Sequence, residues 1–333
     1  MKEIIYAIFL SFFLCGLCGN AEAKKKKEVK KAIKREVQTP YDKLFKGKKA
    51  FTVNGLMKMH LMAGKVYAEF PIELLNRDLA LTSSIEDISD NGEGVVGQFA
   101  GRVNQFRFTL QDSMLQARLV RRYGVKNTGM GKNADQIIER SNTPGIFQSY
   151  KILAYTPDKK AVVVDMTELF LESSRLTNPF PSYAGNSLYG FVQRIHKFQS
   201  QRSELLGICG NDNSMSVRCN LGFNVDRLVL GSFMQAKDVP VSVTVNKILM
   251  LLPEDPMRPR LADSRIGVNA IIQTELPDVC QGIKPYYITK RWRIEPVDEI
   301  RYKQGEMVDV KKPIVFYIDT LMPDSWKPYI KEG

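Results

Sequence analysis

Most of the chain consists of short segments in which apolar and polar residues alternate, with turn signals roughly every 8–15 residues between them. In residues 55–71, for example, Met57 and Met59 alternate with Lys58 and His60, and a second alternating run follows a glycine-containing turn. Alternation with a period of two predicts half-buried strands, and two such runs around a tight turn predict a β-hairpin. On this pattern His60 shares a polar face with Lys58, so we expect it to face solvent.

The same pattern recurs along the rest of the chain. Two further hairpins are predicted over residues 102–122 and 149–166, and strands over 217–229, 239–252, 285–294 and 313–318. Residues 74–89 fit either a strand or a short helical turn, 167–173 indicates a short helix, and 193–202 reads as a basic polar connection. These segments predict a β-rich α+β protein with antiparallel hairpins, sandwich-like sheets and a few short helices.

The N-terminus has the pattern of a secretory signal peptide. Lys2 precedes an apolar run at residues 4–17, and small residues end the segment at Ala21-Glu22-Ala23, an A-x-A cleavage pattern. The apolar run is shorter than the roughly 20 residues that a membrane span needs. We therefore expect an exported protein, located in the periplasm, on the outer surface or in the medium, with no transmembrane span after cleavage.

The formal net charge of +12 is concentrated in a tail. Residues 24–36 hold eight basic and two acidic residues, and such a run stays solvated because its charges repel one another. The tail is expected to be a disordered spacer, or else to contact an anionic surface. The residues proposed for that contact are Lys24, Lys25, Lys26, Lys27, Lys30 and Lys31. No specific nucleic-acid partner is predicted, since the excess charge does not indicate a basic groove.

Motifs for catalysis or metal binding are missing from the printed sequence. The chain has two histidines, His60 and His196, and neither has a second histidine four residues later, so there is no H-E-x-x-H motif. Cys209, Cys219 and Cys280 follow the signal segment and show no C-x-x-C spacing. Cys209 and Cys219 fit either a disulfide across a hairpin or burial as free thiols. We expect no catalytic residue, metal ligand or cofactor in this chain.

A proline-rich segment at residues 253–267 contains three arginines and several acidic residues. The planar guanidinium group suits paired contacts with carboxylates, so this segment fits either a local salt-bridge network or a contact between domains. The candidate interdomain residues are Arg258, Arg260, Asp263, Arg265 and Trp292.

Five blocks of sequence carry a family resemblance. They are residues 39–47 (TPYDKLFKG), 65–71 (KVYAEFP), 249–267 (LMLLPEDPMRPRLADSRIG), 290–296 (KRWRIEP) and 311–319 (KKPIVFYID), of which 251–267 and 311–319 are the most specific. The chain resembles the N-terminal part of the large secreted zinc-dependent metalloproteases of the Bacteroides type. In that family, domains of unknown function precede a metzincin-like catalytic domain with an extended H-E-x-x-H motif.

The resemblance implies a domain organisation and a role. After the signal peptide at 1–23 and the basic disordered tail at 24–38, it implies a small β domain at 39–95, a larger β-rich domain at 96–310, and the first strand and helix start of a truncated metzincin-like domain at 311–333. Zinc is expected only in the missing catalytic domain, and the chain alone is expected to be inactive.

Two functions are consistent with the sequence. The first is a non-catalytic accessory or pro-region that supports or covers a catalytic domain of this metalloprotease family. The alternative is a free-standing periplasmic or surface β-domain that binds an anionic partner through its lysine-rich tail.

Overall fold

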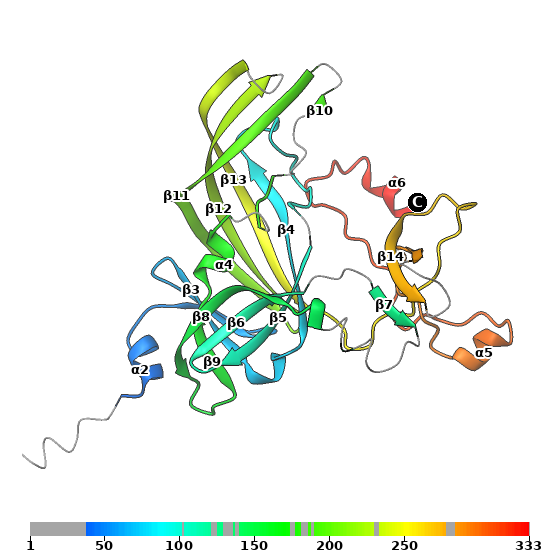
Figure 1. The fold of residues 1–333 in the computed structure, drawn as a ribbon, viewed down its shortest axis with the longest axis horizontal. Coiled ribbons are helices and arrows are strands. Elements are labelled where there is room, and N and C mark those ends of the chain that lie inside the picture. Colours follow the sequence, from blue (N-terminus) through cyan, green and yellow to red (C-terminus); the bar gives the residue numbers. More distant parts are fainter. Residues whose placement is uncertain are drawn as a thin grey trace, which may run out of the picture. The chain divides into compact units, whose positions relative to one another are not determined.

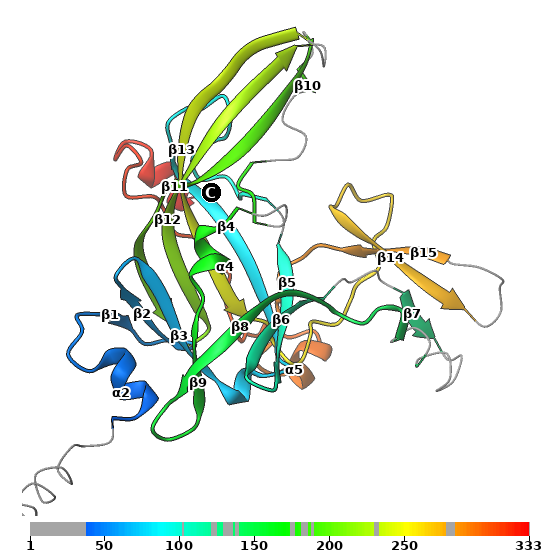
Figure 2. The same ribbon diagram turned by 60° about the vertical axis from the view of Figure 1, so that its left-hand side comes forward.

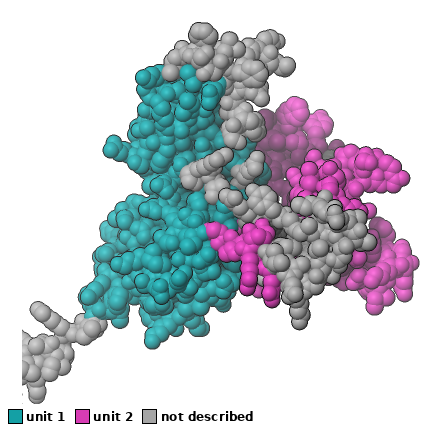
Figure 3. Space-filling model, viewed as in Figure 1, with its two compact units in different colours: residues 1–119, 146–252 teal, residues 120–145, 253–333 magenta. Residues whose placement is uncertain are grey.

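The computed structural model of the protein describes residues 38–332, apart from 102, 121–124, 129–135, 137–139, 174–176, 181–185, 188–189, 230–232 and 278–283. The expected β-rich α+β class is confirmed, because the described residues form long antiparallel ladders and only short helices (Figure 1). They divide into two compact units, one from residues 1–119 and 146–252 and the other from residues 120–145 and 253–333 (Figure 3). No helix among the described residues has the length and apolar character needed to cross a membrane.

The first unit is built on one sheet of 12 strands, ordered β1-β2-β3-β9-β8-β6-β5-β4-β13-β12-β11-β10. In chain order these are β1 (Phe51–Val53), β2 (Lys58–Met62), β3 (Lys65–Pro71), β4 (Asp78–Ile88), β5 (Asn104–Gln111), β6 (Met114–Leu119), β8 (Gly145–Tyr155), β9 (Ala161–Asp165), β10 (Asn186–Ser187), β11 (Gly190–Asn211), β12 (Ser214–Val229) and β13 (Phe233–Leu251). Helices α2 (Pro40–Phe45) and α4 (Thr167–Leu171) accompany them. In Figure 2 the long strands β11, β12 and β13 extend past the others as an arm.

The three expected hairpins are confirmed. Strands β2 and β3 turn at Ala63 and Gly64, whose φ angles of 50° and 72° are both left-handed. A two-residue turn of this kind matches the twist of the flanking strands. Strands β5 and β6 turn at Asp112, also at a positive φ, and β8 pairs with β9 around residues 156–160. The turns fix the register, which places Lys58 opposite Glu69.

Residues 193–202 were expected to be a connection, and this prediction was wrong because they belong to β11. The ladder is continuous there, with His196 opposite Val225 on β12. The inward face of β11 carries Arg194 and His196 instead of apolar residues, and both pair with Glu93. Because these inward-facing residues are polar, this part of β11 lacks the alternation of apolar and polar residues that would have indicated a strand. The ambiguous segment 74–89 is mostly strand β4.

The sheet of the first unit curls until its early strands meet β11. The backbone N–H of Leu56, just before β2, donates a hydrogen bond of 2.7 Å to the carbonyl of Asn211 at the end of β11. The approach is so close that a Cβ atom at Gly55 would lie 2.8 Å from the Asn211 carbonyl oxygen. Only glycine fits this position without moving the neighbouring backbone.

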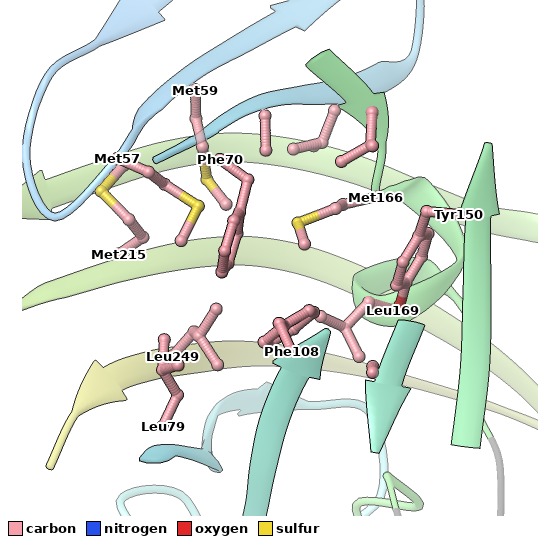
Figure 4. Close-up of a cluster of buried hydrophobic side chains, with 14 of the residues drawn as sticks. Met57, Met59, Phe70, Leu79, Phe108, Tyr150, Met166, Leu169, Met215 and Leu249 are labelled. Carbon is pink, nitrogen blue, oxygen red and sulfur yellow. The ribbon is translucent and has the colours of Figure 1, made fainter. Parts of the chain in front are cut away.

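The curled sheet encloses a hydrophobic core to which most of its strands contribute (Figure 4). Phe70 from β3 and Phe108 from β5 lie at its centre, with their ring centroids 4.8 Å apart. Met57 and Met215, from the two ends that meet, are also fully buried. Burying each large apolar side chain contributes roughly 1.5–3 kcal/mol, so this enclosed cluster is the main source of stability in the unit.

A second hydrophobic cluster lies on the arm, where Phe223 and Val243 pack with Phe180. A loop at residues 89–101 follows β4 and is fastened to that strand by backbone hydrogen bonds between Ile85 and Gln98 and between Ser83 and Ala100. The loop therefore takes the place of a neighbouring strand along this part of β4.

The second unit contains a sheet of three strands, ordered β15-β14-β7. Strands β14 (Ala270–Pro277) and β15 (Lys284–Thr289) are antiparallel, whereas β14 and β7 (Val125–Thr128) are parallel. Two short helices follow, α5 (Glu299–Lys303) and α6 (Lys327–Glu332). The Asp298 side chain caps α5 by accepting hydrogen bonds from two backbone N–H groups of its first turn.

The strand expected at residues 313–318 is not formed, because among the described residues no other strand pairs with it. The strand expected at 285–294 ends at Thr289, and the helix start expected within residues 311–333 lies at Lys327.

We predict that Gly55→Ala destabilises the first unit by about 1–3 kcal/mol, because the added methyl group forces apart two backbone segments that close the sheet. Urea unfolding followed by circular dichroism measures this change. Gly207→Ala, on β11 of the same unit, is the matched control, since a Cβ atom there would meet no atom within 4 Å. It should change the free energy of unfolding by less than about 0.5 kcal/mol. Equal effects of the two substitutions would contradict the role of Gly55.

Candidate functional site

A buried carboxylate, Glu69 on β3, lies at the centre of a polar cluster under helix α2. Its Oε1 atom accepts hydrogen bonds from the Tyr41 hydroxyl at 2.6 Å and from His60 Nε2 at 3.0 Å. Lys58 Nζ lies 3.3 Å from the other carboxylate oxygen. Tyr41 belongs to helix α2. This helix begins with a capping box, in which the side chains of Thr39 and Asp42 each accept a hydrogen bond from the other residue's backbone N–H group.

The expectation that His60 faces solvent was wrong, because its exposed fraction is only 6%. Helix α2 covers the polar face of the hairpin, and the Phe45 ring lies 4.4 Å from the imidazole. Both ring nitrogens have partners, Nδ1 with the Thr52 hydroxyl at 2.8 Å and Nε2 with Glu69. The capping-box sequence before α2 was the signal that could have indicated a helix over this face.

The charges in this cluster stabilise one another. Burial by itself raises the pKa of Glu69, but the hydrogen bonds from His60 and Tyr41 and the charge of Lys58 outweigh it and lower the pKa. Burial and the hydrogen bond to Glu69 raise the pKa of Tyr41. Glu69 is therefore ionised and already bonded to several donors, an arrangement that positions α2 and does not leave a free general base.

Beside this cluster is a cavity of about 790 Å³. Its lining comes from α2, the segment before β2, the end of β3 and the β8–β9 turn. The lining includes the polar residues Tyr41, Lys58, Glu69, Asp158, Lys159 and Lys160. This volume lies within the range of small-molecule sites in proteins.

A second buried carboxylate, Glu93, fastens the loop at residues 89–101 to the arm. It accepts a hydrogen bond from His196 Nε2 at 2.8 Å and one from Arg227 at 3.0 Å, and Arg194 lies 3.3 Å away. Burial raises the pKa of Glu93, but these partners outweigh it and lower the pKa. The imidazole of His196 also stacks on Phe180 at 4.0 Å. These contacts make the cluster a fastening between loop and strands.

A buried lysine and a buried thiol hold the C-terminal end of helix α4. Lys247 Nζ on β13 donates to the carbonyl oxygen of Glu172 at 2.9 Å, and Cys219 Sγ on β12 lies 3.2 Å from the carbonyl of Phe170. These two carbonyls belong to the last turn of α4, where carbonyl groups have no partner within the helix. Burial lowers the pKa of Lys247 to about 8 and raises the pKa of Cys219 to about 11.

Of the two alternatives for Cys209 and Cys219, the disulfide is not formed, and Cys219 is a buried free thiol whereas Cys209 is exposed. Both are free cysteines, and in the β11–β12 ladder Cys209 lies opposite Ser216 whereas Cys219 lies opposite Leu205. Cys280 lies outside the described residues. Within the described ranges, no group of three or more histidine, cysteine, aspartate or glutamate side chains is arranged to hold a metal ion.

The candidate interdomain residues all lie in the second unit. Arg265 pairs with Asp263 only two residues away, with an N–O distance of 2.5 Å, which is a local contact. Arg258 and Arg260 take part through their backbone carbonyls, which accept hydrogen bonds from Arg291 and from the N–H of Thr289. These bonds attach the proline-rich segment along β15 and do not bring the arginine side chains together.

Trp292, the remaining candidate, is exposed and its ring lies 6.2 Å from that of Phe316. The six lysines proposed for an anionic surface, Lys24 to Lys31, lie outside the described residues, so that contact stays a prediction.

The second unit exposes much of its apolar side-chain surface. Phe316 and Tyr317 have exposed fractions of 79% and 92%, and Met307 is exposed at 98%. Every buried apolar residue found in the described part of the chain belongs to the first unit. Within this unit the exposed rings of Trp292 and Phe316 are in contact, and contiguous exposed apolar surface of this kind marks interaction sites in soluble proteins.

Two protein-family models match the chain. A family model described as Domain of unknown function (DUF5117) matches residues 97–297, which is more than half of the chain. The chain belongs to the DUF5117 family. A second model, Domain of unknown function (DUF5118), matches residues 38–88. No curated protein and no solved structure matches the chain.

The DUF5117 segment contains strands β5 to β15, with Lys247, Cys219 and the proline-rich segment at 253–267. The DUF5118 segment contains α2, strands β1 to β4 and the Glu69 cluster. Both matched segments line the cavity, because Lys58 lies in the DUF5118 segment and Lys159 lies in the DUF5117 segment. The two sequence families therefore share one folded unit.

The lowered pKa of Lys247 predicts a pH dependence of stability. In the unfolded chain lysine has a pKa of 10.5, above the folded value of about 8, so the unfolded state binds more protons between these values and stability rises with pH. Cys219 acts oppositely from pH 9 to 11, because its folded pKa exceeds its unfolded value of 9.0. The free energy of unfolding should therefore rise by about 1 kcal/mol from pH 8 to 9.

Urea unfolding at closely spaced pH values measures this dependence. Lys247→Met should abolish the rise between pH 8 and 9, and Cys219→Ala should extend it toward the unfolded lysine value of 10.5. The same pH profile in the Lys247→Met protein and in the unmodified chain would show that Lys247 is not the group responsible.

Proposed function

We propose that this DUF5117 protein is a non-catalytic accessory region of an exported zinc-dependent metalloprotease. On this proposal it supports or covers a catalytic domain of that family by packing the exposed apolar surface of its second unit against it. The sequence blocks at 249–267 and 311–319 support the family connection through their resemblance to such proteases. The printed chain has no H-E-x-x-H motif, so the proposed role is structural.

The exposed aromatic surface of the second unit carries this proposal. Residues 314–318 read IVFYI, a sequence with high strand propensity, yet they form no strand and are unpaired. Among the described residues, no backbone hydrogen bond involves residues 312–318. An apolar, strand-forming segment with free backbone groups is a template for pairing with a strand of another domain.

The neighbouring side chains suit the same role. Trp292 and Phe316 are in contact edge to face, and Tyr317 is almost fully exposed. Aromatic residues are enriched at the centres of protein interfaces because they bury large areas with little loss of side-chain entropy. A domain that packs here would remove this surface from water.

We predict that Phe316→Ser combined with Tyr317→Ser lowers the fluorescence of a dye that binds exposed apolar surface and slows aggregation. The free energy of unfolding should change by less than about 0.5 kcal/mol, because both side chains are exposed. Phe99→Ser is the control, since Phe99 is an exposed aromatic residue of the first unit. If the control lowers dye binding and aggregation as much as the double substitution, the second-unit surface is not the dominant interaction site.

The connection with a protease has its own test, which is the coding DNA on the 3′ side of the Gly333 codon. A sequence encoding H-E-x-x-H, in the same frame or a shifted one, is expected there. If it is present, the encoded domain should co-elute with this protein, and the double substitution should weaken that association. Absence of the motif would overturn the proposed link to a metalloprotease.

A further inference from the structure

The turn between β8 and β9 holds a lysine in a backbone conformation that lysine rarely adopts. Lys159 has a φ of 57°, in the left-handed region that favours glycine. Hairpin turns of this length commonly place glycine at the left-handed position. Non-glycine residues in such conformations occur often at ligand-binding and active sites.

The rest of the turn is rigidly bonded, so the position of Lys159 is well determined. The Asp158 carboxylate accepts hydrogen bonds from the Thr156 hydroxyl at 2.6 Å and from the backbone N–H of Lys160 at 3.1 Å. The backbone N–H of Thr156 donates to the carbonyl of Ala161, and that of Lys159 donates to the carbonyl of Thr156. These hydrogen bonds fix the backbone of Lys159 and Lys160 and do not involve the ammonium groups of the two side chains.

Those two lysines form part of the wall of the cavity beside the Glu69 cluster. Within the described part of the chain, the ammonium groups of Lys159 and Lys160 make no hydrogen bond and no ion pair. The third cation of the lining, Lys58, is already paired with Glu69. The cavity therefore offers two positive charges that no neighbouring carboxylate neutralises through a direct contact.

The remaining lining limits what these charges can bind. Much of the wall is apolar and includes Leu56, Met57, Pro71, Ile72 and Pro157. The same wall includes the carboxylates of Glu69, Glu73 and Asp158, which repel a doubly charged anion more strongly than a singly charged one. The lining suits a ligand with one negative charge and an apolar body.

We propose that this cavity binds an apolar molecule that ends in a carboxylate, with Lys159 and Lys160 receiving the carboxylate. A fatty acid and the C-terminus of a peptide share this chemistry. The side chain of Lys159 supplies a charge that glycine, the residue favoured at this left-handed φ, would lack. This inference does not depend on the proposed association with a protease.

Isothermal titration calorimetry with the full chain tests the proposal. Octanoate represents the fatty acid and N-acetyl-alanyl-leucine the peptide C-terminus, whereas octanamide and inorganic phosphate serve as reference ligands. At least one carboxylate should bind, and the uncharged amide and phosphate should bind about tenfold more weakly or not at all. Which carboxylate binds distinguishes the two sources. Failure of both carboxylates, or equal binding of octanoate and octanamide, would overturn the proposal.

Lys159→Gly separates binding from folding. It should weaken carboxylate binding about tenfold, which corresponds to the loss of one charged contact, and it should raise the urea midpoint by relieving the left-handed backbone. Lys159→Arg should retain binding. Lys151→Ala, on an exposed lysine of β8 that does not line the cavity, should alter neither binding nor midpoint. Unchanged binding in Lys159→Gly would show that Lys159 does not receive the carboxylate.

Discussion

The close approach of two backbone segments at Gly55 and Asn211 is the constraint on which the first unit depends. One hydrogen bond from Leu56 and the absence of a side chain at Gly55 let the β2–β3 hairpin meet the end of β11. This meeting turns a sheet that would have one exposed apolar face into a sheet that encloses its core. The cavity depends on it as well, because Gly55 and Leu56 line that cavity next to the Glu69 cluster.

Buried charges then determine where the covering segments lie. Glu69 receives the hydroxyl of Tyr41 from α2, Glu93 attaches its loop to Arg227 on β12, and Lys247 holds the end of α4. A buried charge that loses its partner is costly, so each contact specifies one position for its segment better than apolar packing alone would. The hydrophobic clusters stabilise the unit, and the buried charges determine the positions of the segments that cover it.

The sequence predicted the hairpins well because their turns have recognisable chemistry, as at Ala63-Gly64, and because their strands alternate. It did not predict β11, since the buried partners of Arg194 and His196 come from a loop about 100 residues earlier in the chain. His60 was misplaced for a related reason, because a helix outside the hairpin covers its polar face. The strand expected at 313–318 depended on a partner strand that is not found among the described residues. Local patterns thus indicate elements, whereas burial depends on distant contacts.

The curled sheet also has a consequence for the order of folding. Strand β4 pairs with β13, and the β2–β3 hairpin meets β11, so the chain must be available as far as Leu251, the end of β13, before the sheet can close. Proteins dominated by contacts between distant residues fold slowly, because the entropy of closing long loops is lost before the contacts form. During that interval the hairpins from the first half of the chain expose the residues that later form the core, including Phe70 and Phe108. Newly made chains would therefore pass through a stage in which they bind chaperones readily.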